Sequence, residues 1–130
     1  MAKPPSQPRP TDAELEILNV LWQHGPSTVR DVYEQLAKSK PVVYTTVLKL
    51  LQIMSEKDLV RRDETERAHV YEPRLPQEQM QKQLVTDLLN RAFEGSAKDL
   101  VMQALSSKRA SREDLAEIRL LLDSYERGAK

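Results

Sequence analysis

The sequence is poor in several residue types, and each shortage excludes a class of protein. It has no cysteine, which excludes disulfide frameworks, thiolate metal sites and cysteine nucleophiles and is compatible with a reducing cytoplasm. Its three scattered glycines cannot form a glycine-rich phosphate loop. No apolar run is long enough to span a membrane, and the N-terminal segment MAKPPSQPRP lacks the apolar stretch of a signal peptide. We therefore expect a cytoplasmic protein without membrane insertion.

Net charge is absent as well, because 20 Lys and Arg residues balance 20 Asp and Glu residues. Any electrostatic footprint for nucleic acid must therefore be local. One such stretch exists: no acid occurs between Glu34 and Glu56, whereas Lys38, Lys40 and Lys49 lie there. A solvated face with a chance excess of lysine explains this fact equally well.

The sequence offers few groups for catalysis. Its two histidines, His24 and His69, belong to no His/Asp/Glu spacing that would converge on a metal ion. We therefore expect no enzymatic activity, no metal site and no cofactor. A histidine can act as a switch near neutral pH, but the simpler interpretation of His69 is a strand residue that faces solvent or phosphate beside Arg61 and Arg67.

Helical periodicity begins after a proline-rich arm at residues 1–10, which we expect to be flexible. Thr11 and Glu14 have the form of a capping box and open a helix at about 12–23. The sequence therefore places the start of folded structure at Thr11.

Two further helices are predicted in the first half of the chain. The cap at Ser27 and Thr28 opens a helix at about 28–38. Pro41 suits the first turn of the next helix, because its missing N–H would be unpaired there anyway. The apolar stripe of this third helix comprises Val43, Val47, Leu50, Leu51 and Met54.

Two short strands are predicted after the third helix, at residues 59–62 and 68–71, joined by the polar segment 63–67. Three helices followed by a hairpin is the order of a winged helix-turn-helix domain, here residues 11–75. The short link at 38–41 would hold the second and third helices at a steep angle, which presents the third helix to a DNA major groove.

The face of the third helix opposite its apolar stripe carries side chains suited to DNA. Thr45, Thr46, Lys49 and Gln52 provide hydroxyls, an ammonium group and an amide, which reach base edges and phosphates without acidic obstacles. Tyr44 could stack on a sugar or bind a phosphate, or it could simply pack on the neighbouring helix.

The predicted hairpin carries cations and acids together. Arg61, Arg62 and Arg67 could clamp phosphates, but acidic side chains lie among them and would repel the DNA backbone. We expect any contact of the hairpin with DNA to use a few arginines and not its tip. The acids are Asp63, Glu64 and Glu66.

Beyond Pro76 the sequence predicts three more helices, of which Gly95 closes the first and Ser111 caps the last. Their apolar side chains exceed what about 50 residues bury alone, so we expect residues 76–130 to form a helical dimerisation domain with two-fold symmetry. Packing back on the winged helix is the alternative. The expected fold class is mainly α with a small β-hairpin, a winged helix-turn-helix followed by a three-helix dimerisation region. The residues expected at the dimer interface are Leu84, Leu88, Phe93, Leu100, Leu115, Ile118 and Leu122.

Six segments match a known pattern: ELEILNVLW (14–22), TVRDVYEQL (28–36), VYTTVLKLL (43–51), EKDLVRR (56–62), RAHVYEP (67–73) and LLNRAFEG (88–95). The most specific part is the combination of YTTV in the third helix, a hairpin ending in VYEP and a three-helix tail. Over residues 11–125 the sequence thus resembles the penicillinase-repressor family, the BlaI, MecI and CopY type of bacterial transcriptional repressors.

The resemblance implies a homodimer that binds DNA through N-terminal winged helices and dimerises through C-terminal helices. Such a dimer would block transcription at a pseudo-palindromic operator in double-stranded DNA. By similarity, Thr45, Thr46 and Lys49 would face the bases, whereas Lys40 and Arg67 would contact phosphates.

The sequence also departs from the family. Copper-responsive members carry a C-terminal cysteine motif, so the absence of cysteine excludes copper or zinc sensing by that route. In β-lactam-responsive members a membrane-bound sensor protease triggers cleavage in the helix that matches residues 100–105, and the matching bond here lies near Gln103 and Ala104. The resemblance leaves this route of release open. Asp58 and Glu66 stand where many relatives have glycine.

Two other functions are compatible with the sequence. A winged helix that binds another protein without reading DNA is favoured slightly by the neutral charge, because the fold alone does not fix function. A ligand-responsive regulator of another family would need a small-molecule pocket, which an aromatic content of 5% does little to line.

Overall fold

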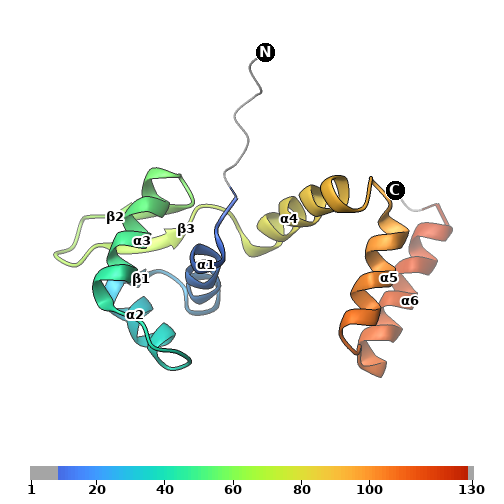
Figure 1. Cartoon of the computed structure of the whole chain (residues 1–130), viewed down its shortest axis with the longest axis horizontal. Helices are drawn as coiled ribbons and strands as arrows, with labels where there is room; N and C mark the ends of the chain where they lie inside the picture. Colours follow the sequence, from blue (N-terminus) through green and yellow to red (C-terminus); the bar gives the residue numbers. More distant parts are fainter. Residues whose placement is uncertain (1–8, 129–130) are drawn as a thin grey trace, which may run out of the picture. The chain divides into compact units, whose positions relative to one another are not determined.

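The computed structural model describes residues 9–128, so most of the predicted arm at residues 1–10 lies outside the described residues. The expected fold class is confirmed: the chain is mainly helical with a small antiparallel sheet, in winged-helix order, followed by three helices (Figure 1). The elements are α1 (Asp12–His24), β1 (Ser27–Thr28), α2 (Val29–Ala37), α3 (Tyr44–Glu56), β2 (Val60–Asp63), β3 (Val70–Pro73), α4 (Gln77–Ala92), α5 (Ala97–Ser107) and α6 (Arg112–Glu126).

Side-chain caps fix the starts of α1 and α2, as the sequence predicts. Thr11 accepts a hydrogen bond from the Glu14 amide at 3.2 Å, and the Thr11 amide donates to the Glu14 carboxylate at 2.9 Å. Thr28 and Asp31 form the same reciprocal pair at the start of α2. Each box satisfies two backbone amides that the first helical turn would otherwise leave unpaired.

The sheet has three strands, in the order β1-β3-β2, where the sequence predicts two. The missed strand is β1, whose two residues pair with β3 in the register Ser27 opposite Tyr71. Two residues are too short to show an alternating pattern. The last strand also begins later than expected, at Val70, because Val70 pairs with Asp63 and closes the ladder of the hairpin. We call residues 60–73 the wing.

The predicted start of α3 is wrong. Pro41 lies in the link, and the helix begins at Tyr44 after an N-cap residue, Val43, with extended backbone angles. The successive β-branched residues Val42 and Val43 favour this extended backbone, which delays the first helical turn. The link therefore comprises residues 38–43.

The end of α3 uses a backbone conformation that usually belongs to glycine. Asp58 has φ +66°, and its amide and that of Leu59 bond back to Ser55 and Met54, as in a Schellman motif. Asp58 also forms an ion pair with Arg74. The glycine expected here in relatives is thus replaced without loss of the turn.

One hydrophobic core holds α1, α2, α3 and the sheet together. The Trp22 indole N–H donates to the Leu75 carbonyl at 2.9 Å, and Met80 of α4 is buried in the same core. The fully buried side chains of this core are Ile17, Leu18, Leu21, Val32, Val47, Leu51, Met54, Val60 and Tyr71.

The chain divides into two compact units between Leu84 and Val85, within α4. The domain border expected between residues 75 and 76 stays a prediction. In the second unit α5 and α6 begin at the caps Ser96 and Ser111, the latter as predicted. Figure 1 draws α5 and α6 as an antiparallel pair. No helix between residues 9 and 128 has the length and hydropathy needed to cross a bilayer.

Candidate nucleic-acid interface

Helix α3 has one fully buried face and one open face. Val47 and Leu51 are at most 1% exposed, so they fix the rotation of the helix about its axis. The helical period then turns Thr45, Thr46 and Lys49 outward, and all three are exposed. The structure therefore brings the three residues predicted to face bases onto one surface, and it also exposes Gln52.

This open face carries no negative charge of its own. Lys49 has no hydrogen-bond or ion-pair partner within residues 9–128, so its ammonium group is available to a ligand. No side chain caps the start of α3, because the N-cap residue is Val43, which is 61% exposed. Exposed amides, hydroxyls and an unpaired cation are the donors that DNA acceptors require.

Tyr44 packs on the neighbouring helix and is 37% exposed. Its ring meets the ring of Tyr33 edge-on, with centroids 5.6 Å apart and an interplanar angle of 70°. The Arg30 guanidinium lies 5.1 Å from the Tyr44 centroid, within the range of a cation–π interaction. Tyr44 therefore packs on the neighbouring helix, and its contact with DNA stays a prediction.

The cationic side chains around α3 differ in whether they already have an ion-pair or hydrogen-bond partner. Lys40 forms an ion pair with Glu16 at 2.5 Å, so a phosphate would have to compete with that carboxylate. Arg61 is exposed and has no partner in the described part of the chain. The hydrogen bond with Tyr71 raises the pKa of Arg62, and the Glu64 carboxylate, 2.5 Å away, raises it further.

The tip of the wing, from Asp63 to His69, mixes acidic and basic side chains. At the tip, Asp63 accepts hydrogen bonds from the amide and hydroxyl of Thr65, at 2.9 and 2.8 Å, which hold the pKa of Asp63 below its usual value. Glu64 and Glu66 are exposed beside it. These acids lie in the same loop as Arg67, so a phosphate near this loop meets repulsion as well as attraction.

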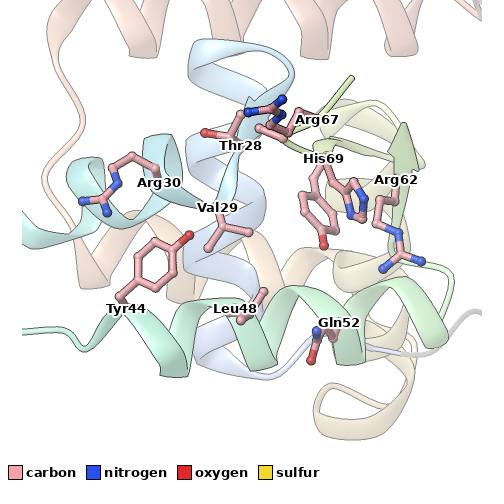
Figure 2. A pocket seen from close by; sticks show the side chains of 11 residues that line it. Thr28, Val29, Arg30, Tyr44, Leu48, Gln52, Arg62, Arg67 and His69 are labelled. Carbon is pink, nitrogen blue, oxygen red and sulfur yellow. The ribbon is translucent and has the colours of Figure 1, made fainter. Parts of the chain in front are cut away.

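A pocket of about 340 Å³ lies between α2, α3 and the wing. Figure 2 shows Arg30 and Tyr44 on one side of it and Arg62, Arg67 and His69 on the other. The remaining lining residues are Thr28, Val29, Leu48, Gln52, Ala68 and Tyr71.

Sequence reasoning misses Arg30 as part of this region. Arg30 lies in the first turn of α2 beside Asp31, and only the packing of α2 on α3 brings it over Tyr44. The cap at Thr28 shows in the sequence where α2 starts, but no signal in the sequence places Arg30 beside Tyr44. The sequence predicts His69 in a strand, but it lies before the first residue of β3.

The residues predicted for dimerisation fall into two groups. Leu88 and Leu122 are 48% and 55% exposed, so they are open to a partner. Leu84, Phe93, Leu100, Leu115 and Ile118 are half-buried within the described chain. Further exposed apolar residues of the second unit are Val85, Val101, Met102, Leu105, Leu120, Leu121 and Tyr125.

The expected cleavage position lies on the surface of α5. Gln103 and Ala104 are exposed, and the hydroxyls of Ser106 and Ser107 donate to the Gln103 carbonyl at 3.1 and 2.7 Å. Among residues 9–128, no group of three or more His, Cys, Asp or Glu side chains could hold a metal ion.

Comparison with known proteins identifies similar sequences and one similar fold. The family model described as penicillinase repressor matches residues 10–124. A penicillinase repressor of Bacillus licheniformis is 24% identical over 123 residues, which cover 95% of this chain and 96% of the relative. The transcriptional regulator BlaI of Mycobacterium tuberculosis is 32% identical over 92 residues, 70% of this chain and 67% of the relative. The solution structure of the DNA-binding domain of the repressor BlaI matches with a TM-score of 0.50 and 26% identity, over 55% of this chain and 88% of that domain.

Proposed function

The chain belongs to the penicillinase-repressor family, and from that membership we propose how it acts as a DNA-binding transcriptional repressor. Two copies of the chain bind one pseudo-palindromic operator, and their α3 helices enter successive major grooves on one side of the duplex. The bound dimer blocks transcription by occupying the promoter. The proposal includes a cytoplasmic location, because bacterial operator DNA lies there.

The observation that carries this function is the open face of α3. Thr45, Thr46 and Lys49 project from a helix whose opposite face is locked into the core, so their positions are set before DNA arrives. A rigid helix loses little conformational entropy on binding. We assign base contacts to these three residues, and phosphate contacts to Lys40 and Arg67.

The homodimer is supported by the surface of the second unit. Helix α6 alone carries four large apolar side chains that are 54% to 69% exposed: Leu120, Leu121, Leu122 and Tyr125. Large apolar side chains that are exposed together on one helix are typical of a protein–protein interface. A second copy is the partner that closes such an interface with two-fold symmetry.

Release of the operator by proteolysis is a further part of the proposal. Gln103 and Ala104 are exposed, but the peptide bond between them lies inside α5. A protease can therefore cut this bond only after local unwinding of the helix. A membrane-bound sensor protease is the proposed partner. Incubation with such a sensor should yield a fragment that ends near Gln103, whereas a chain that stays intact under inducing conditions would exclude this route.

The readout by α3 is tested by Thr46→Ala and Lys49→Ala, measured by fluorescence anisotropy on an operator duplex and on a scrambled duplex. Each substitution should lower the preference for the operator by about tenfold, since a good base contact contributes about 1–3 kcal/mol of discrimination. Lys98→Ala is the control, because it removes the same charge from α5. Operator affinity that is unchanged in both α3 variants would contradict the assignment.

A further inference from the structure

Val43 is a large apolar side chain that the first unit leaves open. The helical period assigns it to the apolar stripe of α3, but Val43 is 61% exposed, so that assignment is wrong. Its backbone is extended, with φ -110° and ψ 135°, and the helical period therefore does not set the direction of its side chain. Within residues 9–84, the only other large apolar side chain that is exposed is its neighbour Tyr44, at 37%.

The position of Val43 in α3 is as unusual as its exposure. Val43 is the N-cap residue of α3, and no side chain caps this helix. The caps of α1, α2, α5 and α6 are Thr11, Thr28, Ser96 and Ser111. Valine is a poor N-cap residue, whereas serine or threonine stabilises a helix start. Valine thus weakens the start of α3 without gaining burial, and residues that break a local rule in this way are expected at functional sites.

The structure holds Val43 firmly at the start of the helix proposed to read DNA. Its carbonyl accepts hydrogen bonds from the amides of Thr46 and Val47 at 3.0 and 3.2 Å, and the next residue, Tyr44, packs on α2. A β-branched side chain is stiff, so it loses little conformational entropy when it meets a ligand. In helix-turn-helix proteins the N-terminal residues of the recognition helix contact base edges, and Val43 lies at that end of α3.

The C5 methyl group of thymine is the apolar group that base edges present in the major groove. We propose that Val43 contacts the C5 methyl group of one thymine in each operator half-site and is a specificity-determining residue of the repressor. The contact removes apolar surface of both groups from water, and cytosine offers no such partner because it lacks the methyl group. This inference rests on the proposed function.

The test uses an operator duplex selected from a random pool, in which each thymine in turn is replaced in both half-sites by deoxyuridine, which lacks only the C5 methyl group. Fluorescence anisotropy gives the affinities. At one position the wild-type protein should lose about fourfold in affinity per half-site, as for one methyl group left in water, whereas Val43→Ala should lose nothing there. Val42→Ala is the matched control, because Val42 is half-buried in the link, and it should keep the wild-type loss.

A second variant, Val43→Ser, separates the base contact from folding. Serine at the N-cap should raise the urea midpoint of unfolding, because its hydroxyl can accept an amide of the first turn, and the variant should still lose the dependence on the methyl group. The inference is overturned if either Val43 variant keeps the wild-type loss, if Val42→Ala abolishes it, or if no thymine methyl group affects the wild-type affinity. A wild-type protein that prefers no duplex over a scrambled one would instead contradict the proposed function itself.

Discussion

The two units of this chain have opposite relations between sequence and burial. The first ends at Leu84, and its described residues, 9–84, include twelve apolar side chains buried in one core. In the second, which begins at Val85 within α4, no described residue is buried, although α5 and α6 are regular helices. Helices of 11 to 16 residues are marginal in water on their own. The second unit therefore has the local signals that form helices, but one chain does not bury the apolar side chains of these helices.

The first unit buries its apolar side chains within one chain, whereas the second leaves them exposed, as the proposed dimer would require. A core that is closed within one chain holds α3 at a fixed rotation, which a DNA-reading surface requires. In the proposed dimer, the apolar surface that one chain leaves open would join two such units, as a two-fold symmetric operator requires. Each substitution predicted next changes either the buried core of the first unit or the exposed apolar surface of the second.

The largest effect is expected from Leu51→Ala in the closed core. Leu51 is 0% exposed, so the change leaves a cavity under α3 and should lower the free energy of unfolding by about 2–5 kcal/mol. Urea unfolding followed by circular dichroism measures the change. The neighbouring Leu50→Ala is the control, since Leu50 is half-buried; equal losses from the two variants would contradict the packing described for α3.

The next effect is expected from Leu122→Asp on the open surface. A charge in the proposed interface should separate the dimer, and loss of the second half-site contact should weaken operator binding by about 100-fold. Sedimentation velocity gives the oligomeric state, and anisotropy gives the affinity. Glu117→Gln changes one charge at an exposed polar position of α6 and should leave both unchanged. A Leu122→Asp protein that stays dimeric would place the interface elsewhere.

A smaller effect concerns Glu14, which links the start of α1 to the end of α3 in the closed core. Burial raises the pKa of this carboxylate, but hydrogen bonds from Lys57 at 2.8 and 2.9 Å and from the Thr11 amide outweigh burial, so the pKa lies below its ordinary value. A lowered pKa means that the stability Glu14 contributes is complete above the unfolded-state pKa, about 4.3, and is lost as the pH falls through the folded-state value.

Glu14→Gln should therefore cost about 1.5 kcal/mol at pH 7, and the difference from the wild type should shrink between pH 5 and pH 3. Urea unfolding at pH 7, 5 and 3 measures it. Glu16→Gln serves as the control on the same helix, because its pair with Lys40 is half-exposed and should contribute under about 0.5 kcal/mol. A constant difference across the three pH values would show that the Glu14 charge is not what stabilises the core.

Local signals predict much of the fold correctly. The caps at Thr11 and Ser111 and the stop at Gly95 are where the sequence indicates them, because a cap depends on residues within one turn. The errors arise where structure depends on partners. The strand at Ser27 exists only because β3 pairs with it, and Pro41 satisfies a rule for helix starts that the extended backbone at Val43 overrides.

The sequence predicts which residues form the candidate interface, but it does not predict the contacts among them. The open face of α3 follows from its helical period, so Thr45, Thr46 and Lys49 can be identified directly. The contacts of Tyr44 with Arg30 and of Lys40 with Glu16 join separate elements, and no spacing in the sequence indicates them. The pocket between α2, α3 and the wing depends on three elements meeting and is absent from the prediction.

The most direct test of the central claim is selection of bound duplexes from a random DNA pool by the wild-type protein at near-physiological salt, followed by sequencing. A dimer that reads DNA through α3 should enrich a two-fold symmetric site with half-sites about 10 base pairs, or a multiple of that, apart. A folded dimer that enriches no sequence would contradict the account and would favour a winged helix that binds protein.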